Sequence, residues 1–219
     1  MALPRLKLAG ATWRDRGMAC LAAAAAIAFS GALTTWLAGH HVALLMAGSV
    51  GASAVLLFAV PSSPLGQPWP IIGGTVISLA CGILAVQLLG HGALAAGLAV
   101  GLAILLMSAT RCLHPPGGGA ALIAVIGSPE VLARGYGFAL VPGALNAVLL
   151  VLAGIAYHRF SGHSYPHRPV PAPGDPRVLP EDIDAALAEA QESFDVNRED
   201  LAALLEAAER HAIARRKGK

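Results

Sequence analysis

Long apolar stretches along the chain alternate with short breaks of Pro, Gly, His or a charged residue. Six apolar segments result, at about 17–38, 41–60, 70–90, 93–109, 116–127 and 136–157. Apolar stretches of about 20 residues are typical of bilayer-crossing helices, so the pattern predicts an all-α, polytopic transmembrane bundle. The fifth segment is too short to span alone. We expect either a broken or re-entrant helix there, or a crossing completed by the preceding residues.

Composition supports a lipid bilayer as the surroundings of this bundle. Charged residues make up 13% of the chain, against about 25% in soluble domains, and the mean hydropathy is +0.64. Between Arg16 and His158 the charged residues are Arg111, Glu130 and Arg134. The other basic residues flank the apolar block, which indicates membrane topology rather than a nucleic-acid partner.

The cysteines do not suggest a disulfide framework or a metal site. Cys20, Cys81 and Cys112 are odd in number, widely spaced and set in apolar stretches. Such cysteines are typical of small buried hydrophobic residues, and no Cys/His spacing of a zinc site accompanies them. We therefore predict no metal and no cofactor.

Charge and proline divide the chain into four parts: a basic cytoplasmic segment (1–16), a transmembrane domain (17–159), a Pro-rich linker (160–179) and a two-helix cytoplasmic tail (180–219). Basic residues at both edges of the apolar block place both termini in the cytoplasm if there are six crossings. Five crossings would place the C-terminus outside. A cleavable signal peptide is the alternative for the first segment, which is long for one and lacks a convincing cleavage site.

The tail should form two amphipathic helices. Pro180 suits a first helical position, and Asn197 suits an N-cap followed by acidic residues in the first turn. Two short helices can hardly form a core by themselves. We expect them to pack on the membrane domain, on a second subunit or on a partner.

The run RCLHPPGGGAALIAVIGSP, which begins at Arg111, is costly in lipid and therefore points to a functional site. Its two prolines prevent the preceding helix from continuing, and its three glycines leave N–H groups unshielded at a helix start. A small anion would be attracted by those donors and by the positive end of the helix dipole. Arg111 adds a permanent cation and His114 a titratable imidazole. The predicted substrate-binding residues are Arg111, His114, Gly117, Gly118 and Gly119, and Pro115 and Pro116 are the predicted structural break.

Architectural interpretations of the same residues stay open. Arg111 could snorkel to the interface at the end of the fourth segment, and His114 could cap that helix. If both groups face the anion, Arg111→Gln should lower flux and His114→Gln should flatten its pH dependence. If the glycines provide close backbone approach, a β-branched residue at Gly118 or Gly119 should obstruct it.

An internal similarity suggests a second structural break. Residues Gly51–Gly74 parallel Gly118–Gly143, and Gln67 and Pro68 stand where the first copy is interrupted. Three segments per copy would give a 3+3 inverted repeat, an arrangement common among transporters. Chance similarity between small, apolar, Pro-punctuated stretches is the alternative.

The HPPGGGAAL stretch after an apolar helix, with SPLGQP at Ser63–Pro68, resembles the HPP family of integral membrane proteins over about residues 14–159. The resemblance implies a multi-helix membrane domain and, by analogy with plastid and cyanobacterial members, nitrite transport. Bacterial members often continue into a pair of nucleotide-binding CBS modules, which this tail does not contain. Trp69 and Pro70 stand where an arginine would be expected after the Gln-Pro pair, which removes one positive charge.

The leading hypothesis is a transporter or channel for a small inorganic anion, with nitrite first, in a bacterial inner membrane. Association into a homo-oligomer, with a dimer favoured, is expected from the many small residues. The alternative is a non-transporting scaffold or sensor that acts through its cytoplasmic tail. The apolar block holds no paired carboxylates and no nucleophile beside a base, so we do not expect an enzyme.

Overall fold

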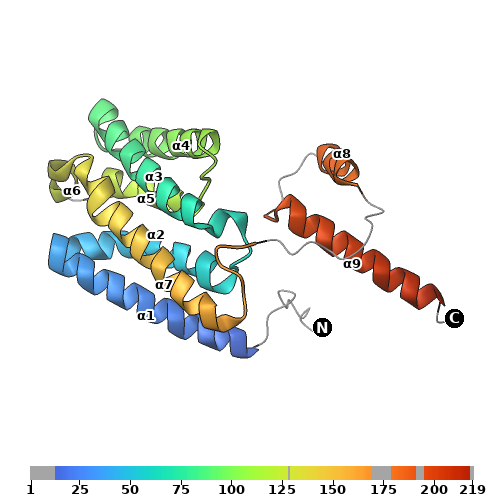
Figure 1. Ribbon diagram of the computed structural model, residues 1–219. Coiled ribbons are helices and arrows are strands. Elements are labelled where there is room, and N and C mark those ends of the chain that lie inside the picture. The colour runs from blue at the N-terminus through green and yellow to red at the C-terminus, as the bar shows by residue number, and fades with distance from the viewer. Residues whose placement is uncertain (1–12, 128, 169–178, 191–194, 218–219) are drawn as a thin grey trace, which may run out of the picture.

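A computed structural model describes residues 13–127, 129–168, 179–190 and 195–217 (Figure 1). The described residues form helices and turns in this order: α1 (Trp13–Ala38), α2 (His40–Ala59), η1 (Pro64–Gly66), α3 (Pro68–Leu89), α4 (Ala93–Ala109), α5 (Pro116–Ile126), α6 (Pro129–Arg134), η2 (Ala139–Ala144), α7 (Leu145–Ser161), α8 (Pro180–Ala190) and α9 (Arg198–Lys217). The predicted all-α fold is confirmed. Helices α1, α2 and α3 and the combined η2–α7 stretch are long and apolar enough to cross a membrane.

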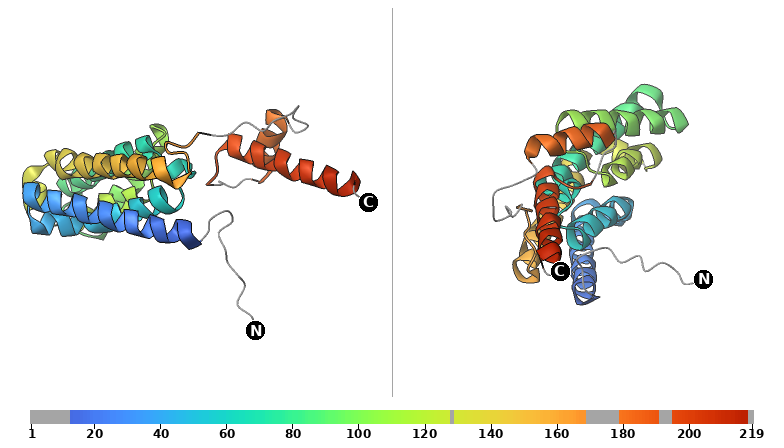
Figure 2. Two further views of the ribbon diagram at one scale, coloured as in Figure 1. Left: turned by 60° about the horizontal axis from the view of Figure 1, so that its bottom comes forward. Right: turned by 90° about the vertical axis from the view of Figure 1, so that its right-hand side faces the viewer.

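The helices of the membrane domain run back and forth between two ends of one bundle, as the left view of Figure 2 shows. At one end, Trp13 and Ser161 line the same cavity, and the Tyr165 hydroxyl donates to the Gly66 carbonyl. We call this the tail end, because α8 and α9 follow it. The chain therefore enters and leaves the membrane domain on the same side.

The opposite end of the bundle, the far end, is held by side chains that cross between helices. The Arg134 guanidinium donates to the Ala38 carbonyl at 3.2 Å, and the Tyr136 hydroxyl donates to Gln87 Oε1 at 3.0 Å. A histidine in the turn between α3 and α4, His91, lies 2.7 Å from the Val125 carbonyl near the end of α5. Helix α5 thus runs from the bundle interior toward the far end.

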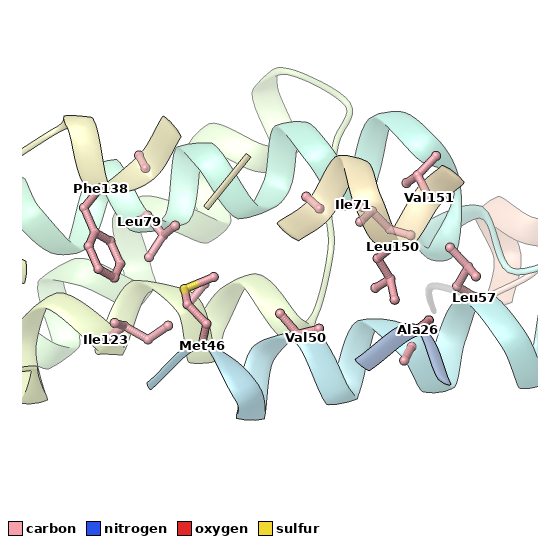
Figure 3. Close-up of a cluster of buried hydrophobic side chains, with 14 of the residues drawn as sticks. Ala26, Met46, Val50, Leu57, Ile71, Leu79, Ile123, Phe138, Leu150 and Val151 are labelled. Atoms are coloured by element: carbon pink, nitrogen blue, oxygen red, sulfur yellow. The ribbon is translucent and has the colours of Figure 1, made fainter. Parts of the chain in front are cut away.

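Helix α3 is the central helix of the bundle and packs against α4, α5 and α7. In the most apolar 18 residues of α3, 61% of the residues are buried, against 22% in the corresponding stretch of α1. The largest hydrophobic cluster joins side chains of α1, α2, α3, α5 and α7 and contains Leu57, Ile71, Leu79, Phe138 and Leu150 (Figure 3). Small residues let these helices approach closely enough to bury such side chains.

The chain leaves α4 and enters α5 through a specific cap. Arg111 takes a left-handed φ of 55°, its N–H donates to the Ser108 carbonyl, and the Cys112 N–H donates to the Met107 carbonyl. This pair of bonds is the Schellman motif, which usually places glycine at the left-handed position. Pro116 then opens α5 as its first residue.

With 11 residues, α5 extends about 17 Å, which is short of a bilayer core of about 30 Å. Whether its path is re-entrant, and whether the two halves form an inverted repeat, stay predictions. The expected Asn197 cap is confirmed, because its Oδ1 accepts from the Asp200 N–H at 2.9 Å. The predicted linker falls largely on 169–178 and the basic segment on 1–12, which lie outside the described residues.

Close packing of α3 on α5 depends on Gly82. A Cβ added there would collide with the Ala121 carbonyl oxygen, whereas a Cβ at Gly48, on the exposed side of α2, would meet nothing within 4 Å. We predict that Gly82→Ala lowers the free energy of unfolding by about 1–3 kcal/mol, because one backbone must move away from the other. Gly48→Ala, the control, should be neutral or slightly stabilising. Thermal unfolding in detergent measures both, and equal melting temperatures for the two variants would contradict the packing.

Candidate functional site

A small cavity of about 10 Å³ lies inside the membrane domain between α2, α3 and α7. This is close to the room that one water molecule needs. Met46, Val50, Ile71 and Leu150, which Figure 3 shows, contribute its apolar wall. Ser49, Ser53, Thr75 and Asn146 contribute polar groups, and none of the described lining residues is charged.

Asn146, on α7, is the polar residue of this cavity that links it to α1. The Asn146 Oδ1 accepts from the Thr34 hydroxyl at 3.0 Å, and its Nδ2 donates to the Pro142 carbonyl at 3.1 Å. Asn146 is only 2% exposed, so both interactions are shielded from solvent and lipid. Pro142 lies in the π-helical segment η2, and its carbonyl accepts from the Leu145 N–H as well as from this amide.

His114 connects the cavity to the break before α5. Its side chain is fully buried, its Nδ1 lies 2.9 Å from the Leu65 carbonyl and its Nε2 lies 2.8 Å from Ser53 Oγ. A carbonyl oxygen only accepts, so Nδ1 carries a proton. His114 therefore joins α2 to the turn that precedes α3.

The Ser53 hydroxyl has one hydrogen and two acceptors within reach. Its Oγ lies 2.9 Å from the Ser49 carbonyl and 2.8 Å from His114 Nε2. With a neutral His114 the hydroxyl donates to Nε2. With a cationic His114, Nε2 donates to Ser53, and the hydroxyl hydrogen turns to the Ser49 carbonyl. Protonation of His114 would thus reverse the direction of a hydrogen bond at the wall of the cavity.

The glycines of the HPPGGG stretch have distinct roles in the structure. Gly117 and Gly118 donate their N–H groups to the carbonyls of His114 (2.8 Å) and Pro115 (3.0 Å), so these two donors already have partners. A Cβ at Gly117 would lie 2.5 Å from Ser78 Oγ and 3.0 Å from Met107 Sδ, whereas Gly118 and Gly119 have open space. Close packing against neighbouring side chains thus occurs at Gly117, while the approach of an anion to Gly118 and Gly119 stays a prediction, and all three have helical backbone that requires no glycine-specific φ.

The remaining predicted site residues lie toward the tail end. Arg111 is exposed at the cap of α4, outside the hydrogen-bonded group around His114. Pro115 and Pro116 provide the turn into α5, and Pro68 opens α3 after Gln67. Gln67 Nε2 donates to the carbonyls of Pro61 and Ser63, so this amide holds the turn before α3. The structure joins His114 to Ser53, a lining residue of the cavity, but does not bring Arg111 there.

Sequence reasoning missed three polar contributors to this region. Ser49, Ser53 and Thr75 are single hydroxyl residues within apolar helices, a pattern that also fits ordinary helix packing. It also missed the role of Trp69, whose Nε1 donates to the Thr110 carbonyl at 3.1 Å and so satisfies a carbonyl at the end of α4. No sequence signal distinguished these residues.

A wider cavity of about 360 Å³ lies at the tail end between α1, α2 and α7. Asp15, Arg16, His158 and His163 line it together with apolar side chains. The imidazole of His158 is held by the Ser161 hydroxyl and by the Leu57 carbonyl, each at 2.8 Å. Within the described residues, no three His, Cys, Asp or Glu side chains are placed to hold a metal ion.

A family model for the transmembrane region of HPP proteins matches residues 9–166, well over half of the chain. The chain belongs to the HPP transmembrane family. Two relatives from Dictyostelium discoideum, each described as a transmembrane protein, are 40% identical over 148 residues and 39% identical over 122 residues. These alignments cover 63% and 54% of this HPP chain and 52% and 39% of the relatives, so this chain spans about half or less of their length. No solved structure matches it.

Gly117 provides the sharpest test of how the HPP motif is placed. We predict that Gly117→Ala displaces the start of α5 and lowers the free energy of unfolding by about 1–3 kcal/mol, because its Cβ meets Ser78 and Met107. Gly118→Ala, the matched control one residue later, should be tolerated. Thermal unfolding of the purified variants checks this, and a destabilised Gly118→Ala beside a normal Gly117→Ala would refute the assignment.

Proposed function

We propose that this protein is a membrane transporter or channel for a small inorganic anion, which passes through the cavity beside His114. One observation carries the proposal: a fully buried imidazole at the start of α5 is hydrogen-bonded to Ser53, a lining residue of a cavity inside the membrane domain. Intramembrane ionisable groups of this kind commonly mark a substrate path. Cationic His114 would attract an anion, and its deprotonation would favour release.

Nitrite is the first anion to test, because the resemblance to transporting HPP members suggests it. Nitrate, formate and bicarbonate are alternatives that the residues do not exclude. Nitrite has three heavy atoms and needs more room than about 10 Å³. The described arrangement therefore represents an occluded state in this proposal, and transport requires the cavity to widen.

The charge distribution supports a cytoplasmic tail end. Arg14, Arg16, Arg159 and Arg168 lie at this end, against Arg134 at the far end. Basic residues favour the cytoplasmic side of a bilayer, so we propose that both termini are cytoplasmic in a bacterial inner membrane. Association into a homodimer and the absence of enzymatic activity are part of the same proposal.

A non-transporting scaffold or sensor is the second candidate. The contact between the tail and the turn before α3, from Asp195 to Ser63, favours it. A panel of anions tested with purified protein in liposomes separates the two. Absence of flux for every anion, with correctly inserted protein, would favour the sensor.

Ser53 tests the proposed path directly. We predict that Ser53→Ala lowers nitrite flux about tenfold or more, because His114 loses its partner at the cavity wall. Ser30→Ala is the matched control: Ser30 is also buried, but its hydroxyl bonds to the Ile27 carbonyl within α1. Flux through inserted Ser53→Ala equal to wild type would place the path elsewhere.

Arg111 is a charged residue in a left-handed backbone conformation that favours glycine. We predict that Arg111→Gly raises the free energy of unfolding by about 1 kcal/mol, because the left-handed φ costs other residues about that much. The same change should lower anion flux, most strongly at low ionic strength, because an exposed cation steers anions to the tail end. Arg111→Lys keeps the charge and should retain most of the flux. An Arg111→Gly variant that is more stable and transports normally would limit Arg111 to an architectural role.

A further inference from the structure

The tail is fastened to the turn before α3, which we call the docking loop (Pro61–Gln67). The Ser63 hydroxyl lies 2.9 and 3.1 Å from the carboxylate oxygens of Asp195, to which it donates, and it accepts from the Leu65 N–H at 3.2 Å. Ser63 is 1% exposed. A buried serine thus connects the start of α9 with the backbone of the docking loop.

Gln67 fastens the start of the linker, just after α7, to the same loop. Its Nε2 donates to the carbonyls of Pro61 (3.0 Å) and Ser63 (2.8 Å), and its Oε1 accepts from the His167 N–H at 2.8 Å. Both ends of the amide are therefore occupied. Gln67 holds the loop closed on one side and the chain after α7 on the other.

Tyr165 and His167 complete the interface. The Tyr165 hydroxyl donates to the Gly66 carbonyl at 3.0 Å, and burial raises the pKa of this phenol, so it stays a protonated donor across the physiological range. His167 Nε2 lies 2.7 Å from an Asp200 carboxylate oxygen, which ties the segment to α9. Asp195 of the tail and Tyr165 and His167 of the linker thus all bond to one short loop.

The docking loop is also the support of His114. Leu65 lies between Ser63 and Gln67, and its carbonyl accepts the hydrogen bond of His114 Nδ1 at 2.9 Å. The position of that carbonyl is set by the turn η1, whose N–H and carbonyl groups are held by Ser63 and Tyr165. A displacement of the tail would therefore change the support of the buried imidazole.

We propose that the tail is regulatory and binds at the docking loop. When α8 and α9 are docked, they hold His114 in place and keep the cavity occluded. Undocking frees His114 and allows the cavity to widen. This direction agrees with the structure, in which the cavity has room for about one water and the tail is docked. Gln67 and Ser63 are positioning residues that act on the site through Leu65. The effect on transport rests on the proposed function, whereas the coupling between tail and His114 does not.

The test uses the full chain in lipid nanodiscs and in liposomes. Tyr165→Phe combined with Asp195→Ala removes the linker bond to Gly66 and the tail bond to Ser63 and substitutes no residue of the membrane domain (17–159). Asp184→Ala is the control, because the Asp184–Arg198 ion pair joins α8 to α9 without touching the docking loop. Hydrogen exchange followed by mass spectrometry reports separately on the linker segment around His167 and on the start of α5, and nitrite flux is measured on the same variants.

We expect exchange at the His167 segment and at residues 114–120 to rise together by about tenfold in the double variant, since a net hydrogen bond corresponds to a factor of that order. Nitrite flux should rise several-fold, and Asp184→Ala should change neither. Faster exchange at His167 with unchanged exchange at 114–120 would overturn the coupling. If exchange rises at both segments but nitrite flux falls, the proposal that the docked tail inhibits transport is wrong. Wild-type protein without flux would contradict the proposed function, while the exchange result would still decide the coupling.

Discussion

The arrangement of this membrane domain depends on one buried imidazole with two hydrogen bonds. His114 Nδ1 bonds to the Leu65 carbonyl, and Nε2 bonds to Ser53, so a single side chain joins the start of α5, the turn before α3 and the middle of α2. A buried polar group without partners is costly, which makes these two bonds a strong constraint on the three segments. Gly74, whose missing side chain leaves room for the His114 Cβ, allows the imidazole to lie against α3.

The constraint explains why the HPP motif has its composition. His114 supplies the bonds, the prolines end one helix and begin the next, and Gly117 lets α5 lie against Ser78 and Met107. The polar path that results connects the cavity near Asn146 with a turn that the tail contacts. Transport and its control would then use the same few hydrogen bonds, because the cavity wall and the docking loop meet at His114.

Much of the fold follows from the sequence, since apolar length and helix-breaking residues are local signals. The helical class, the start of α5 at Pro116 and the Asn197 cap were all predicted from such signals. The site was predicted only in part. The motif indicated His114, but the partners Ser53 and Leu65 are distant in sequence and carry no local signal. Arg111 was expected at the site because it is adjacent in sequence, whereas the Schellman cap turns it to the exposed tail end.

The proton arrangement of His114 is the central claim and can be observed directly. Nitrogen-15 NMR of histidine-labelled protein in lipid, with His114→Gln as the spectrum that assigns the signal, reports which ring nitrogens carry protons. We predict a protonated Nδ1 in the resting protein and a change at Nε2 on addition of nitrite, because Nε2 bonds to Ser53, which lines the cavity. An unprotonated Nδ1, or a signal that saturating nitrite leaves unchanged, would contradict it.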